Sequence, residues 1–148
     1  MALKIYESAN PATAFSSDGE FSNPISVAVD GIVGATILRR YFVRNDSALH
    51  YYTDIQVTSV VNSGLDIVSG ATAGFAWKLI AGDSQPLEDQ WGIIAPGNTM
   101  ELADIGELGD ADTTTYLPFW LRIEVPRGVD VQSFENVSLE ITATEALA

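Results

Sequence analysis

The clearest indication of the fold class is the segment Tyr116-Leu-Pro-Phe-Trp-Leu-Arg-Ile-Glu-Val125. Phe119, Leu121, Ile123 and Val125 share one face, and Trp120, Arg122 and Glu124 share the other. A repeat of two residues with one apolar and one charged face is typical of a β-strand that is buried on one side. The stretch therefore predicts a strand that packs one face on a core.

The same alternation recurs along most of the chain. It is found in residues 25–29, 55–58, 75–79 and 137–144, and more weakly in residues 99–105. Gly and Pro leave segments of about five to ten residues between them, which is strand length rather than helix length. About eight short strands separated by turn signals indicate an all-β fold, either an immunoglobulin-like or a jelly-roll β-sandwich.

Residues 35–61 are harder to interpret because they contain no Gly or Pro, and their apolar residues also fit a helical stripe. We predict two strands here, since the segment is rich in β-branched and aromatic residues. The turn between them is placed at Asn45-Asp46-Ser47. The only helical turn that we expect lies near Ser84–Asp89, with Ser84 as its cap and Pro86 just inside it.

The 148 residues suit one domain of ordinary size. We assign residues 25–148 to a single β-sandwich domain and residues 1–24 to an N-terminal strand followed by an extended arm. This arm is either a poorly ordered terminus or a segment that docks on a neighbouring subunit. The residues that would make the second kind of contact are Ile5, Tyr6, Phe15 and Phe21.

The charge and the residue types exclude several function classes. Asp and Glu number 20 against 7 Lys and Arg, which disfavours nucleic-acid binding, since that rests on basic contacts to phosphate. The chain has no Cys and one His, His50, so thiol chemistry is excluded and a zinc site is nearly excluded. Without a Gly-x-Ser-x-Gly elbow or a phosphate loop, we predict no catalytic residues, no cofactor and no enzyme activity. No signal peptide and no membrane span are expected either.

One acidic stretch is the single candidate for an ion site. Asp104, Glu107, Asp110 and Asp112 carry oxygen ligands of the kind that calcium prefers, although their spacing is not that of an EF-hand. The alternative is a solvated acidic loop. Between Lys78 and Arg122 there are eight acidic residues and no basic residue, which predicts a strongly negative lobe.

The three tryptophans are candidates for a sugar-binding platform or for packing. Trp77 alternates with Lys78 and is assigned to the core. Trp120 lies on the charged face of its strand and is the better candidate for an exposed contact residue. Trp91 precedes Gly92 and is placed at the edge of a loop.

The segments Tyr116–Gly128 and Leu139–Glu145 resemble the closing strands of small accessory structural proteins from tailed-bacteriophage virions. The opening Met1-Ala-Leu-Lys-Ile-Tyr6 is similar in style. The resemblance implies a β-sandwich subunit that decorates the capsid or sits in the tail as a homo-oligomer, with a major capsid or tail protein as partner. It implies synthesis in the host cytoplasm and location in the virion, and brings no catalytic residues.

Three hypotheses follow. The first is a virion structural protein, a capsid decoration or cement protein that binds the shell through loops and the N-terminal arm. The second is a carbohydrate- or receptor-binding module of a phage tail or cell surface, motivated by the tryptophans and the acidic loop. The third is a sandwich enzyme that uses the acidic loop, kept because a fold does not determine a function.

Overall fold

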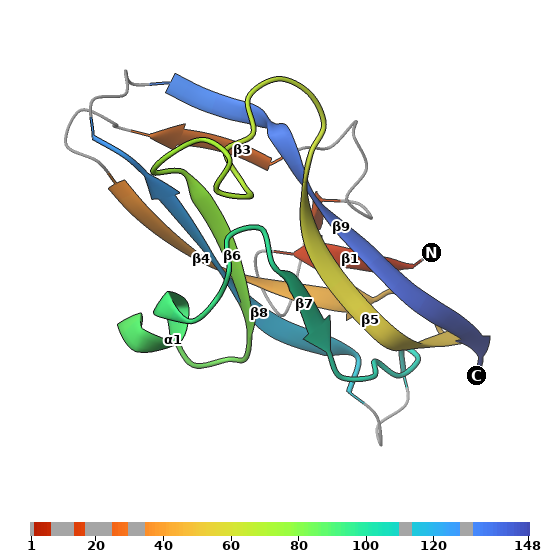
Figure 1. Cartoon of the computed structure of the whole chain (residues 1–148). Helices are drawn as coiled ribbons and strands as arrows, with labels where there is room; N and C mark the ends of the chain where they lie inside the picture. Colours follow the sequence, from red (N-terminus) through yellow and green to blue (C-terminus); the bar gives the residue numbers. More distant parts are fainter. Residues whose placement is uncertain (1, 7–13, 17–24, 30–34, 110–113, 128–131) are drawn as a thin grey trace.

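The protein forms two stacked antiparallel β-sheets, as seen in a computed structural model that describes residues 2–6, 14–16, 25–29, 35–109, 114–127 and 132–148 (Figure 1). Sheet A contains, in spatial order, β2 (Ala14–Ser16), β1 (Leu3–Tyr6), β4 (Ala35–Asn45), β8 (Tyr116–Val125) and β6 (Ala76–Ala81). Sheet B contains β3 (Ile25–Val29), β9 (Gln132–Leu147), β5 (His50–Val61) and β7 (Thr99–Leu102). The all-β sandwich predicted from the sequence is confirmed.

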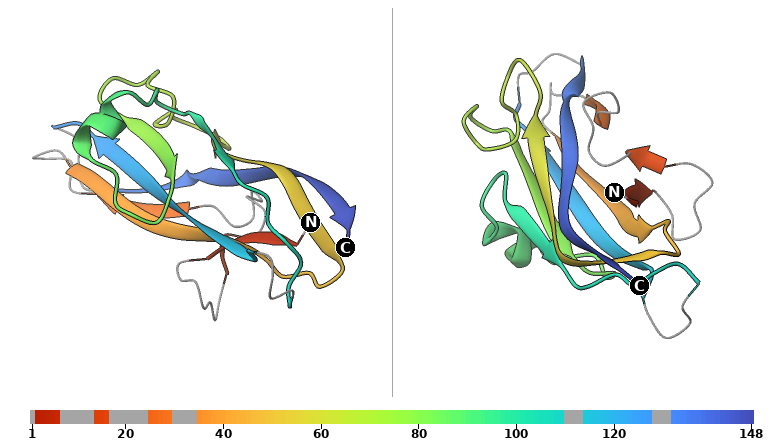
Figure 2. Two further views of the ribbon diagram at one scale, coloured as in Figure 1. Left: turned by 90° about the horizontal axis from the view of Figure 1, so that it is seen from below. Right: turned by 90° about the vertical axis from the view of Figure 1, so that its right-hand side faces the viewer.

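The strand order is that of a jelly roll. From β3 onward each strand lies in the opposite sheet from the strand before it, as the two views of Figure 2 let the reader follow. The pairs β3–β9, β4–β8 and β5–β7 are nested, as if one long hairpin had been rolled up. This arrangement is the two-Greek-key pattern of jelly rolls. Of the two sandwich types that the sequence left open, immunoglobulin-like and jelly-roll, the structure has the jelly roll.

The alternating segments form strands because each buries one apolar face between the sheets. In β8, Phe119, Leu121, Ile123 and Val125 are buried, as their spacing predicts. The ambiguous segment forms β4 and β5, with the turn directly after Asn45. The core lies between the sheets and includes Trp77, Tyr52 and Leu139, so the assignment of Trp77 is confirmed.

Pro118 lies inside β8, a central strand, where proline is rare because it lacks an N–H. Its carbonyl oxygen accepts a hydrogen bond from Gly82 N at 3.1 Å, so the Pro118 carbonyl points toward β6. The N–H and C=O of one residue lie on the same side of a strand, so the N–H that Pro118 lacks would also have pointed toward β6. Its absence therefore removes no hydrogen bond between β4 and β8. The residue is therefore tolerated where β6 ends.

The strand β1 belongs to the sandwich. It pairs with β4 from Leu3↔Asn45 to Tyr6↔Phe42, and both Leu3 and Ile5 are fully buried in the core. The expectation that Ile5 and Tyr6 dock on a neighbouring subunit is therefore wrong, since these side chains are buried by this chain itself. Of the other arm residues, the side chain of Phe15 and all of Phe21 lie outside the described part of the chain.

The segment between β6 and β7 holds α1 (Glu88–Gly92) where an eighth jelly-roll strand would run. The outer edge of β6 is met by loops instead: Trp77 N donates to Val68 O at 3.1 Å, and Asn98 exchanges two hydrogen bonds with the backbone of Leu79. The helix begins after Leu87, so the predicted cap at Ser84 is wrong. The Leu87 N–H is bound instead by Gln90 Oε1 at 2.7 Å.

One buried side chain ties together the end of the sandwich at which both chain ends lie (Figure 1). Asn45 Nδ2 donates to His50 O at 2.8 Å and to Gly106 O at 3.0 Å, and its Oδ1 accepts from Ser47 N at 2.8 Å. These bonds join the β4–β5 turn to the loop after β7. Among the described residues, no helix is long and apolar enough to cross a membrane.

Candidate functional site

The outer face of sheet A, which points away from the core, collects most of the basic residues of the chain. The strand alternation turns five of the seven Lys and Arg residues to this face. These residues are Lys4, Arg40, Arg44, Lys78 and Arg122. The face is therefore the natural place for acidic side chains of the chain or for a polar ligand to bind.

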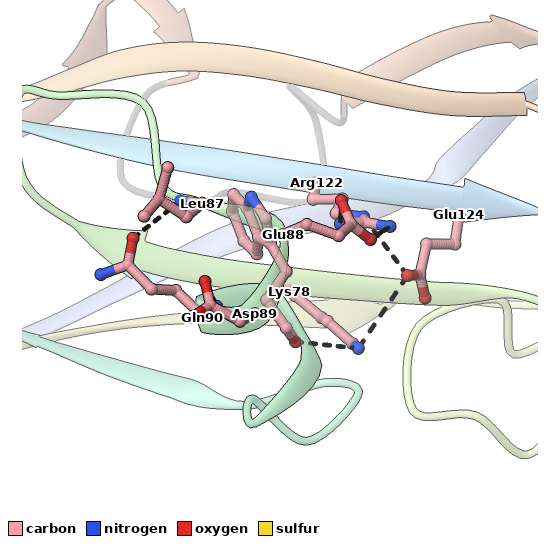
Figure 3. A network of polar contacts seen from close by, with 8 residues as sticks. Lys78, Leu87, Glu88, Asp89, Gln90, Arg122 and Glu124 are labelled. Atoms are coloured by element: carbon pink, nitrogen blue, oxygen red, sulfur yellow. Dashed lines mark hydrogen bonds and ion pairs between the residues drawn. The ribbon is translucent and has the colours of Figure 1, made fainter.

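The helix α1 packs on one half of this face (Figure 3). Arg122 of β8 donates from both terminal nitrogens to the two carboxylate oxygens of Glu88, at 2.8 Å each. Glu124 lies 3.3 Å from Arg122 Nε and 3.9 Å from Lys78 Nζ. Lys78 Nζ also donates to the carbonyl oxygen of Trp91 at 3.2 Å. Four charged groups thus hold one turn of helix against two strands.

Trp91 fills the space under this network and is only 2% exposed. Its ring lies 6.0 Å from the guanidinium carbon of Arg122, within cation–π range. The expectation that Trp91 lies at a loop edge is wrong, because α1 turns the indole inward onto sheet A. The hydrogen bond from Arg122 is the main cause that lowers the pKa of Glu88, and the same bond raises the pKa of Arg122.

The other half of the face contains a groove of about 580 Å³. It is formed where the outward side chains of β4 and β8 meet the loop after β6. Its lining residues are Arg40, Phe42, Asp83, Thr114, Tyr116, Leu117 and Pro118.

Trp120, predicted to be a contact residue, lies at the border between the groove and the α1 network. It is half-buried, and its Nε1 donates to Asp83 O at 3.1 Å. Trp120 therefore makes a contact within its own chain, and this contact fixes the loop that carries Asp83.

Two of the eight acids in the base-free stretch form ion pairs with arginines of the same chain. Asp83 and Glu88 pair with Arg40 and Arg122 of sheet A at 3.0 and 2.8 Å. The strongly negative lobe expected between Lys78 and Arg122 stays a prediction, because these pairs account for only two of its eight acids.

The candidate calcium ligands are only partly within the described residues. Asp104 borders a cleft of about 180 Å³ together with Asp54 and Glu101. Glu107 and Asp104 both line a second hollow. No group of three or more metal-ligating side chains converges within the described ranges. Asp110 and Asp112 lie outside them, so calcium binding stays a prediction.

His50 lies at the start of β5 in a turn contact. Its Nδ1 is 3.2 Å from Ser47 Oγ, and that hydroxyl also accepts from the backbone N–H groups of Leu49 and His50. These bonds hold the β4–β5 turn closed.

Several aliphatic side chains project from loops and strand ends. Ile93 is 85% exposed, Leu147 76%, Leu49 70%, and Leu65 and Leu87 are more than half exposed. Leu49 and Leu147 lie at the same end of the sandwich, since Ala148 N donates to Leu49 O and Leu147 pairs with His50. Leu87 and Ile93 flank α1. Sequence periodicity does not find these residues, because none of them belongs to an alternating apolar face.

Comparison of the chain with protein-family models, with curated proteins and with solved structures finds no match.

Proposed function

We propose that this protein is a non-enzymatic structural subunit of a virion, a capsid decoration or cement protein that binds the shell through its loops. In this proposal the protein assembles as a homo-oligomer, and its partner is a major capsid or tail protein. It is made in the host cytoplasm and ends in the virion. Residues 7–13 and 17–24, which belong to the expected N-terminal arm, lie outside the described residues.

The observation that carries the proposal is the placement of the exposed aliphatic side chains. Leu49 and Leu147 at one end, and Leu87 and Ile93 beside α1, protrude from a sandwich that has its own core of buried side chains. Exposing these side chains to water costs free energy that contact with another protein would recover. The jelly roll supports the same proposal by analogy, because this fold recurs in viral capsid proteins.

The first experiment measures oligomeric state by sedimentation velocity. We expect the wild-type protein to self-associate, and the double variant Leu49→Ser/Leu147→Ser to shift toward monomer with an unchanged circular dichroism spectrum. Thr142→Ala, on the exposed face of sheet B, serves as the control that should change nothing. A wild-type protein that stays monomeric at all concentrations tested would count against the homo-oligomer and against this use of the two leucines.

A further inference from the structure

The groove on the outer face of sheet A has the dimensions of a ligand site. Its volume of about 580 Å³ lies within the range of roughly 300–1,000 Å³ that is usual for small-molecule sites. It is lined by residues of β4 and β8, by Thr114 just before β8, and by Asp83 of the loop after β6, which Trp120 holds in place. The lining combines apolar rings with a small number of polar groups, which is typical of a binding site.

The polar part of the groove is an ion pair with hydrogen-bonding capacity to spare. Arg40 Nη1 lies 3.0 Å from Asp83 Oδ1, and the side chains are 45% and 75% exposed. A guanidinium carries five N–H donors and a carboxylate accepts several hydrogen bonds, so one shared contact leaves donors and acceptors facing the groove. The two charges cancel. The pair therefore suits a neutral ligand whose groups both donate and accept hydrogen bonds.

The apolar part of the groove is an aromatic ring that is held in place from behind. Tyr116 is 42% exposed, and its ring meets that of Phe42 edge-on, with 6.0 Å between the centroids. Phe42 is buried, and its ring also supports the guanidinium of Arg40 at 5.2 Å. One buried ring thus positions both the aromatic surface and the polar pair.

We propose that this groove binds a neutral saccharide, with a sugar ring on Tyr116 and its hydroxyls on the Arg40–Asp83 pair. A sugar has an apolar C–H face and hydroxyls that donate and accept, which matches both parts of the groove. A proline-rich peptide would also stack on the rings, but it brings few donors for Asp83. The inference does not depend on the virion role, since a decoration protein and a free module would use the groove in the same way.

The test uses the indole N–H of Trp120 as a reporter of the groove. This group donates to Asp83 O, whereas the indoles of Trp77 and Trp91 are buried and have no hydrogen-bond partner among the described residues. The ¹⁵N-labelled protein is titrated with maltotetraose, cellotetraose, chitotetraose and mannotetraose, and separately with decaproline. Ligand is added up to about 10 mM, enough to reveal a dissociation constant on the order of 1 mM. Trp120→Phe assigns the resonance.

We expect at least one saccharide to shift the Trp120 indole resonance saturably, and decaproline to leave it unchanged. Tyr116→Ala should weaken binding roughly tenfold, while Tyr116→Phe should preserve it, because the ring and not the hydroxyl makes the stacking contact. Asp83→Ala should weaken binding, and Thr142→Ala on sheet B should not. If the Tyr116→Ala variant does not fold, the proposal is tested by comparing the saccharide affinity of Asp83→Ala with that of Thr142→Ala. No saturable shift with any saccharide, a shift with decaproline alone, or binding insensitive to Asp83→Ala would each overturn the proposal.

Discussion

Arg122 of β8 and Glu88 of α1 form a two-pronged ion pair in which each carboxylate oxygen lies 2.8 Å from a guanidinium nitrogen. Bidentate pairs of this kind are geometrically specific as well as attractive. The pair joins residues 34 positions apart in the sequence. Together with the buried Trp91, it holds in place on sheet A a helix of five residues that is too short to be stable alone.

Replacing Glu88 with Gln should loosen α1 without unfolding the sandwich. The amide cannot reproduce the charge-assisted pair, so hydrogen exchange at the backbone N–H of Trp91 and Ile94 should become faster. Asp89→Asn is the matched control, because it removes the same charge from the same helix and keeps an oxygen for the Gln90 N–H. Equal protection in wild type and Glu88→Gln would show that the pair does not hold the helix.

The same contact should make the attachment of α1 depend on pH. The pKa of Glu88 is lowered from its ordinary value of 4.5, so the folded protein binds this proton less readily than the unfolded chain does. The stabilisation is complete above pH 4.5 and is lost as the pH falls through the lowered pKa. Hydrogen exchange measured across this range should show α1 opening on acidification in the wild type, and a flatter profile in Glu88→Gln.

Trp91 should contribute through its volume rather than through its N–H. The indole is buried, and its Nε1 has no hydrogen-bond partner within the described residues. We expect Trp91→Ala to lower the free energy of unfolding by about 3–5 kcal/mol, and Trp91→Phe to cost much less. Urea unfolding of the two variants measures the difference. Similar losses for Phe and Ala would mean that the N–H matters after all.

Asn45 should contribute more to the free energy of unfolding than an ordinary polar residue, because it is fully buried and joins two loops. Asn45→Ala removes three hydrogen bonds and leaves buried partners unpaired, so we expect a loss of about 2–4 kcal/mol in the free energy of unfolding. Asn62→Ala is the control, since Asn62 Nδ2 makes one hydrogen bond to the described residues, to Ser138 Oγ. Comparable losses in chemical denaturation for the two variants would contradict the special role of Asn45.

The phenol of Tyr6 should ionise at a higher pH than an ordinary tyrosine, and it should stabilise the fold until it ionises. Burial, followed by its hydrogen bond to Asp46, raises its pKa from 10.0 to about 12. Because the raised pKa favours the protonated phenol, the stabilisation is present below pH 10 and is lost between pH 10 and about 12. Tyrosinate absorbance measured against pH, wild type minus Tyr6→Phe, should give a midpoint near 12. A midpoint near 10.0 would contradict the contact.

The strands could be predicted because their signal is local. A period of two reports which face of a strand meets the core, so β8 and the turn after Asn45 follow from neighbouring residues. Which strands pair is a long-range property. The nesting of β3–β9, β4–β8 and β5–β7, which makes this sandwich a jelly roll, therefore leaves no mark in the periodicity.

The site could not be predicted for the same reason. Arg122 occupies a polar position in the alternation of β8, yet it is buried because α1 folds over it from another part of the chain. Asp83 similarly reaches Arg40 across 43 positions. The sequence did show a stretch of acids without bases. It did not show that two of those acids face arginines on sheet A.

Co-sedimentation tests the proposal that this protein is a structural subunit of a virion. Purified protein is mixed with phage shells assembled without it, and the shells are pelleted through a glycerol cushion. We predict saturable binding at a fixed ratio of protein to shell, weakened by Leu49→Ser and Ile93→Ser and unaffected by Thr142→Ala. If the protein stays in the supernatant at every concentration, with capsids and with tail assemblies alike, it is not a subunit of these particles.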